Sequence, residues 1–223
     1  MSSDRVRNIC FHGVGEPQRE LEPGEDVYWV KTDQFEAILD EVASWTVPVR
    51  LSFDDGNASD VEIGLPALVE RNLSGEFFLL AGRLDTPGSV DSPGVKALRS
   101  AGMRIGSHGM DHRSWRGLDG KQREAEFDTA RAVLARAADG PVDTAACPLG
   151  RYDRRVLTEL RGRGYTRVYT SDRRPARAGS WLQPRYSVRR HDTPESLRAE
   201  VLAPAPLPAR ARALAVGTVK RWR

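Results

Sequence analysis

Short apolar runs alternate with longer amphipathic stretches along most of the chain. The apolar runs predict buried strands, and the stretches whose apolar residues recur every three or four positions predict helices with one buried face. The clearest helical stretch follows Asp33, which we interpret as its N-cap, and one face carries four apolar side chains: Phe35, Ile38, Leu39 and Val42.

The pattern predicts seven strands, at residues 7–11, 47–53, 75–81, 103–107, 142–147, 166–170 and 184–190. Besides the helix after Asp33, it predicts helices at residues 63–72, 92–102, 121–138, 154–161 and 194–202. Short connections between them favour a parallel sheet with right-handed crossovers, either doubly wound or closed into a barrel. We predict an α/β fold of one domain, a distorted (β/α)7 barrel over residues 1–202.

The last 21 residues, 203–223, form a Pro/Ala-rich basic tail. Its proline content predicts an extended linker, and residues 209–223 have the composition of a short basic helix. Such a helix would either dock on the barrel or make peripheral contact with a membrane surface.

Charge is unevenly distributed along the 223 residues, although the net charge is only +3. Residues 1–110 carry 10 Lys and Arg against 18 Asp and Glu, whereas residues 111–223 carry 24 against 13. We interpret the basic half as solvated helix faces, because it has neither zinc-finger spacing nor an aromatic RNA-binding signature. No nucleic-acid partner is therefore expected.

Two isolated cysteines, Cys10 and Cys147, do not form a disulfide framework, and neither a signal sequence nor a membrane span is readable. These features predict a cytoplasmic protein. Nothing in the pattern predicts its oligomeric state.

Polar residues collect directly after the predicted strands, where a barrel builds its site. All four histidines of the chain are among them: His12, His108, His112 and His191. The other strand-end residues are carboxylates and a tight turn: Asp54, Asp55, Pro148 to Gly150, Asp172 and Asp192.

His108 and His112 are four residues apart, a spacing that can direct two imidazoles at one ion. Imidazole suits zinc, and a carboxylate as the third ligand would leave positions open for water. The spacing alone is more often that of a solvated pair. It gains weight because Asp54 and Asp55 are predicted at the same rim.

Two adjacent carboxylates after an apolar strand repel each other and are costly to bury. A bound cation and a separate role for the second carboxylate would resolve this conflict, and Gly56 would let the backbone turn sharply. The alternative is an Asp-Asp-Gly turn that caps the next helix.

These residues resemble the motifs of the polysaccharide deacetylases, the NodB-homology carbohydrate esterases. Ser52-Phe-Asp-Asp-Gly56 looks like their T-F-D-D-G motif, and Ser107-His-Gly-Met-Asp-His112 is similar to H-[ST]-x-x-H. An initial Phe11-His-Gly-Val14 resembles the Tyr-His-Gly start of many members. The resemblance covers residues 7–190.

The resemblance implies that Asp55, His108 and His112 bind one divalent metal, with zinc expected and cobalt, nickel or manganese as alternatives. It implies that Asp54 is the general base. It also places Leu149, Gly150 and Asp172 at the oxyanion or substrate subsite.

The third motif of the family, R-x-P-Y, aligns with Ala146-Cys-Pro-Leu149, so both its arginine and its tyrosine are replaced. Leu149 can still offer a backbone N–H, and Arg151 is a sequence-local substitute for the arginine. His191 matches the terminal histidine motif poorly, and His12 is therefore the candidate general acid.

The implied activity is removal of an N-acetyl group from an amino sugar of a polysaccharide or its cytoplasmic precursor. One alternative is hydrolysis of another C–N bond or an O-acetyl ester on the same scaffold. Another is a catalytically weakened barrel that binds saccharide or a partner glycosyltransferase, which loss of the arginine would permit. The complete set of metal ligands and the base argue against this last alternative.

Overall fold

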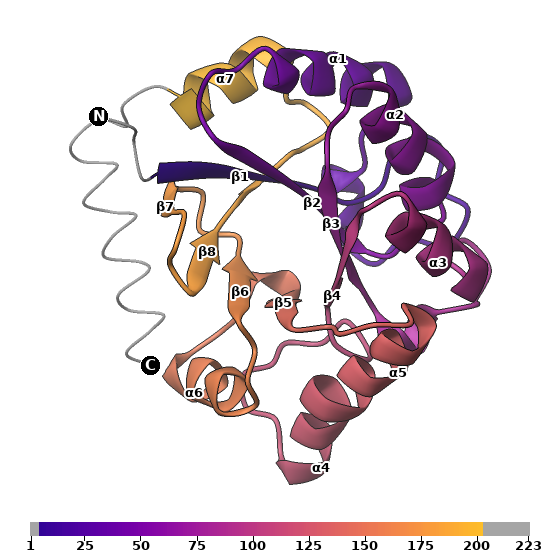
Figure 1. Cartoon of the computed structure of the whole chain (residues 1–223), viewed down its shortest axis with the longest axis vertical. Coiled ribbons are helices and arrows are strands. Elements are labelled where there is room, and N and C mark those ends of the chain that lie inside the picture. The colour runs from indigo at the N-terminus through magenta and orange to yellow at the C-terminus, as the bar shows by residue number, and fades with distance from the viewer. Residues whose placement is uncertain (1–4, 203–223) are drawn as a thin grey trace.

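Six parallel strands follow one another in chain order around the inside of the molecule, in a computed structural model that describes residues 5–202 (Figure 1). Each pairs in parallel with the next. They are β1 (Arg5–Phe11), β2 (Val49–Asp55), β3 (Gly75–Leu79), β4 (Arg104–Ser107), β5 (Thr144–Ala146) and β6 (Arg167–Thr170).

A short segment after β6 nearly closes this sheet into a barrel. Strand β8 (Leu182–Pro184) pairs in parallel with β6, and β9 (Tyr186–Ser187) pairs in parallel with β1. Residues 182–187 therefore lie between β6 and β1 and take the position of the seventh strand of the barrel. A further strand, β7 (Ala176–Arg177), adds to β1 in the antiparallel direction. The predicted (β/α)7 barrel is confirmed.

Helices surround the strands on the outside of the barrel (Figure 1). They are α1 (Thr32–Ala43), α2 (Leu65–Glu70), α3 (Ser92–Ser100), α4 (Gly120–Arg123), α5 (Ala130–Ala137), α6 (Arg154–Gly162) and α7 (Pro194–Leu202). Short 3₁₀ segments occur at η1 (Glu25–Tyr28), η3 (Ala81–Arg83) and η5 (Pro148–Gly150), and π-helical turns at η2 (Asp60–Gly64) and η4 (Glu124–Thr129).

Several boundaries differ from the sequence prediction. Helix α1 starts at Thr32 with Lys31 as N-cap, so the assignment of Asp33 as N-cap was wrong; its carboxylate instead accepts the N–H of Gln34. The helix predicted at 121–138 is one run of α4, η4 and α5. Its true N-cap is Asp119, which exchanges hydrogen bonds with the residue three positions on.

Strand β2 runs two residues beyond its predicted end and includes both carboxylates. Asp54 pairs with Phe78 and Asp55 with Leu79 of β3, and both aspartates are buried. The polar residues were read as a loop because buried strands are normally apolar. The strand continues because its main chain still pairs with its neighbour.

Aromatic side chains fill the layer between β1–β3 and helix α1. Phe53 stacks on Phe77 with ring centres 4.6 Å apart, and Phe11 lies edge-on to Phe35 at 4.9 Å. All four rings are buried. This packing supports the carboxyl ends of β1 and β2, from which candidate site residues emerge.

The inside of the barrel is partly polar below the site. Glu76 accepts hydrogen bonds from the hydroxyls of Thr144 and Tyr169, and Asn8 donates to Gln183. These groups are buried, and apart from Oδ1 of Asn8 their polar atoms named here are paired, so polar side chains fill the barrel interior below the site.

The predicted tail at 203–223, with its linker and basic helix, lies outside the described residues. Within residues 5–202 no helix has the length and apolarity that a membrane crossing needs.

Candidate metal and active site

A cavity of about 260 Å³ opens at the carboxyl ends of the strands. It brings together residues from the ends of β1, β2, β4, β5, β6 and β9 and from the loop after β1. Among the predicted site residues, it is lined by His12, Asp54, Asp55, His108, His112, Leu149 and Gly150.

Asp55, His108 and His112 offer ligand atoms that all lie within 4.8 Å of one another. The Nε2 atom of each histidine is 3.4 Å from Oδ1 of Asp55. Both carboxylate oxygens of Asp55 are buried and have no hydrogen-bond partner among the described residues. Two imidazoles around an otherwise unsatisfied carboxylate fit a divalent transition metal.

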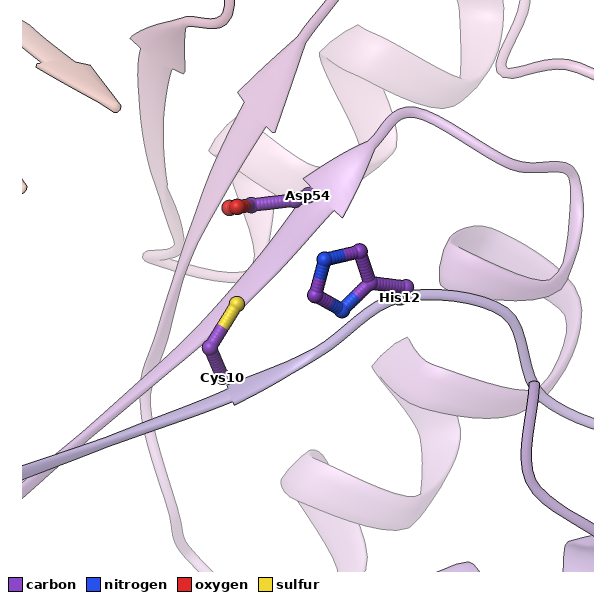
Figure 2. A group of neighbouring side chains, drawn as sticks. All are labelled: Cys10, His12 and Asp54. Carbon is purple, nitrogen blue, oxygen red and sulfur yellow. The ribbon is translucent and has the colours of Figure 1, made fainter. Parts of the chain in front are cut away.

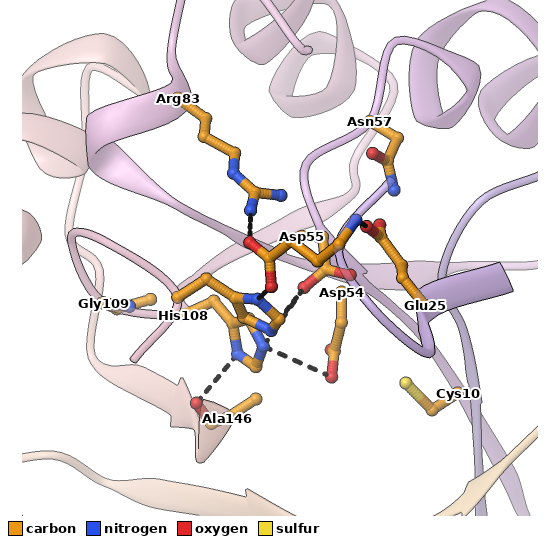
Figure 3. A network of polar contacts seen from close by, with 12 residues as sticks. Cys10, Glu25, Asp54, Asp55, Asn57, Arg83, His108, Gly109 and Ala146 are labelled. Atoms are coloured by element: carbon orange, nitrogen blue, oxygen red, sulfur yellow. Dashed lines mark hydrogen bonds and ion pairs between the residues drawn. The ribbon is translucent and has the colours of Figure 1, made fainter. Parts of the chain in front are cut away.

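Hydrogen bonds at Nδ1 fix how the two histidines face this point. His108 Nδ1 lies 3.0 Å from the carbonyl oxygen of Ala146, and His112 Nδ1 lies 2.7 Å from Oε2 of Glu22. Because each acceptor needs a proton on Nδ1, the lone pair of Nε2 is left for an ion. Figure 3 shows His108 between Ala146 on one side and Asp54 and Asp55 on the other.

Two of the three candidate ligands have a left-handed backbone. Asp55 has φ 78° and His112 has φ 50°, and Gly56 continues the turn at φ 69°. Such conformations are strained for residues with a side chain and are concentrated at functional sites. Here they turn the carboxylate and the imidazole toward each other.

Asp54 is held by a buried arginine that the sequence prediction missed. Nη1 and Nη2 of Arg185 donate to Oδ1 and Oδ2 of Asp54, each at 2.6 Å, and Arg185 is only 1% exposed. The rings of Phe78 and Tyr169 lie 5.3 and 5.6 Å from the guanidinium carbon. The guanidinium therefore has one fixed orientation, in which it forms a bidentate ion pair with both carboxylate oxygens of Asp54.

This pair controls the ionisation of Asp54. Burial alone would raise the pKa of the carboxyl, but the attraction of Arg185 outweighs this effect, and the pKa lies well below its usual range. For the imidazole, burial disfavours the charged form and therefore acts in the opposite direction. It lowers the pKa of His108 to about 4. The carboxylate of Asp54 is thus ionised at any pH near neutrality.

Arg185 lies in the break between β8 and β9, within the region predicted as the seventh strand. That stretch also contains Arg189 and Arg190, so the sequence carries no signal that singles out Arg185. Arg151, the substitute suggested by the sequence, is exposed at the cavity rim, and Ala146 contributes its carbonyl to His108.

His12 stacks on Tyr28 with ring centres 4.9 Å apart, and its Nδ1 is buried with no partner in the described part of the chain. It forms a second cluster of possible ligands with Cys10 and Asp54 (Figure 2). This cluster is the poorer donor set. Arg185 already engages both oxygens of Asp54, and burial raises the pKa of the Cys10 thiol well above its usual value.

The remaining predicted residues are not part of the candidate metal cluster of Asp55, His108 and His112. Asp172 accepts hydrogen bonds from the hydroxyls of Tyr152 (2.6 Å) and Thr170 (2.9 Å). His191 is exposed in the loop after β9. Neither of the two is among the residues that line the cavity. Leu149 is half exposed at the cavity, with a left-handed backbone at φ 56°.

The fold and site together define a (β/α)7 barrel enzyme scaffold with a candidate Asp-His-His metal centre beside an arginine-paired carboxylate. A family model described as polysaccharide deacetylase matches residues 46–168, more than half of the chain. The chain belongs to the polysaccharide deacetylase family.

One curated relative is YxkH of Bacillus subtilis (strain 168), named as a putative polysaccharide deacetylase, with 20% identity over 179 residues. The match covers 74% of this chain and 63% of that protein, so this chain spans less than two thirds of its relative.

Solved structures share the fold. A polysaccharide deacetylase from Bacillus cereus superposes with a TM-score of 0.76 at 17% identity, over 88% of this chain and 69% of the other. The Streptococcus pyogenes deacetylase PplD, solved in complex with acetate, superposes with a TM-score of 0.75 at 16% identity, over 90% and 99%.

Proposed function

We propose that the protein is a metal-dependent deacetylase that removes an N-acetyl group from an amino sugar of a polysaccharide or its precursor. The observation that carries this proposal is the convergence of Asp55, His108 and His112 on one point, directly beside the carboxylate of Asp54. Membership of the polysaccharide deacetylase family supports the substrate class.

Asp55, His108 and His112 would hold the ion, for which zinc is our first choice. Bound by these three residues, a divalent ion would supply Lewis-acid chemistry for the acetyl carbonyl and for a water molecule. The unpartnered oxygens of Asp55 and the free Nε2 atoms supply the donors.

Asp54 is the proposed general base, which accepts the proton of the attacking water at a carboxylate oxygen. Its separation from His108 Nε2 is 4.0 Å, so it lies next to the candidate metal position without belonging to the same ligand group. Arg185 keeps the carboxylate ionised and correctly oriented. The arginine missing from the third motif thus has a counterpart elsewhere in the chain, which favours an active enzyme over a weakened binding barrel.

His12 is the proposed general acid, which donates a proton to the nitrogen as the C–N bond breaks and the free amine leaves. It lines the cavity with one edge buried, whereas His191 is exposed outside it. The backbone at Leu149 and Gly150 lies at the cavity wall, where an N–H can stabilise the oxyanion.

The direct test is acetate release from N-acetylglucosamine oligomers by protein stripped with a chelator and then given Zn²⁺ or Co²⁺. We expect turnover only with metal, and none from Asp54→Asn. His191→Ala is the matched control and should keep activity. Metal-dependent acetate release from O-acetylated xylan alone would replace the proposal with ester hydrolysis, and no release from either substrate would overturn it.

A further inference from the structure

We propose that Glu22 is a positioning residue for the metal centre, through its contact with His112. This inference rests on the proposed function, because it concerns the same metal ligand. It assigns a role to residues 19–28, a part of the loop between β1 and α1 that contains none of the motifs identified from the sequence.

The contact between Glu22 and His112 is a charge-assisted hydrogen bond. Oε2 of Glu22 accepts from Nδ1 of His112 at 2.7 Å, and the His112 side chain is only 9% exposed. Oε1 of Glu22 forms an ion pair with Arg83 of η3. Arg83 therefore holds the carboxylate in place while the carboxylate holds the imidazole.

His112 needs such support because its backbone is strained. Its φ of 50° is left-handed, and it lies in an irregular segment after β4. The main chain of that segment is held from the other side by the buried carboxylate of Glu126, which accepts from Met110 N–H at 2.8 Å and Asp111 N–H at 3.3 Å. Glu126 fixes the backbone, and Glu22 fixes the ring.

The same contact ties the metal centre to one wall of the cavity. Glu22, Glu25 and Tyr28 line the cavity from a single loop. That loop is fastened a second time by the buried ion pair between Arg19 and Glu25, and Arg19 also donates to Asn57 just beyond β2. Loss of the Glu22 contact would therefore release the imidazole of His112, while the ion pair between Arg19 and Glu25 still holds the loop.

The test compares Glu22→Ala, Glu22→Gln and Glu20→Ala. Glu20 lies in the same loop and carries the same charge, but it is exposed and its side chain has no polar partner among the described residues. Zinc affinity is measured by competition with a chromophoric chelator, and Co²⁺ absorption reports the ligand geometry.

We expect Glu22→Ala to weaken zinc binding roughly 10- to 100-fold and to change the Co²⁺ spectrum, as loss of a partner behind a metal-bound histidine does. Glu22→Gln keeps an oxygen acceptor without its charge and should recover part of the affinity. Glu20→Ala should match the wild type. Thermal melting of the apo proteins checks that each variant is folded.

Equal zinc affinity and equal Co²⁺ spectra for Glu22→Ala and Glu20→Ala would overturn the inference while leaving the proposed function intact. Failure of the wild type to bind zinc or cobalt would overturn both. If Glu22→Ala does not fold, Glu22→Gln decides: a zinc affinity equal to that of the wild type would overturn the role of the charge.

Discussion

Replacement of Arg185 by methionine would leave the carboxylate of Asp54 buried without its cation. Asp54 is 3% exposed and Arg185 1% exposed, and two hydrogen bonds of 2.6 Å join them. Removal of one partner from a buried, hydrogen-bonded ion pair typically destabilises a protein by about 3–5 kcal/mol. Methionine retains most of the side-chain volume of arginine. The loss of stability therefore measures the removal of the charge and not the creation of a cavity.

The assay is urea unfolding of four proteins: wild type, Arg185→Met, Asp54→Asn and the double variant. Each single variant leaves one buried group without its partner, whereas the double variant removes both charges. We therefore expect the double variant to be more stable than the sum of the single losses predicts, by about 2 kcal/mol or more. A loss below about 1 kcal/mol for Arg185→Met, or additive losses, would refute the reasoning.

The same variant changes the pH dependence of activity. Because Arg185 helps to lower the pKa of Asp54, its loss raises that pKa, and the acidic limb of kcat/KM should move to higher pH. The stability that the pair contributes in the wild type is present above the unfolded pKa of about 3.9 and is lost as the pH falls below it. Arg185→Met should therefore show a flatter stability profile in acid.

Three further predictions concern the carboxylates and the proton donor. Asp60→Asn should raise the free energy of unfolding at pH 8 by about 1–2 kcal/mol, because both oxygens of this buried residue lack partners in the described chain and burial raises its pKa. Since the raised pKa makes the wild type lose stability as the pH rises, the gain should shrink toward pH 4; an unchanged gain would contradict this cause. Asp54→Asn should retain metal by elemental analysis but lose turnover, whereas Asp55→Asn should lose metal; identical behaviour would refute the division of roles. His12→Ala should lower kcat more than His191→Ala with metal content unchanged, and a loss confined to His191→Ala would reassign the general acid.

The strands and the grouping of the candidate metal ligands at one rim could be predicted because their signals are local. Apolar runs gave the strands to within a few residues, and the rule that strand ends meet at one rim brought His108, His112 and the Asp54–Asp55 pair together. The cavity lining confirms that these residues share one rim. Their chemical roles stay predictions.

The supporting contacts could not be predicted, because they join distant parts of the chain. Arg185 is 131 residues from Asp54, and Glu22 is 90 residues from His112. Their pairing depends on how residues 182–187 close the barrel and how an irregular loop folds over the rim. Rules based on residue spacing consider only residues that are close in sequence. For this reason the sequence suggested Arg151, and not Arg185, as the substitute for the arginine of the third motif.

The central claim is that Asp55, His108 and His112 form the metal centre. It is tested most directly by anomalous diffraction at the zinc edge from crystals of the zinc-loaded protein. The account predicts one strong peak about 2.0–2.2 Å from Nε2 of both histidines and from a carboxylate oxygen of Asp55. The absence of a peak at these atoms, or a peak only between Cys10, His12 and Asp54, would contradict it.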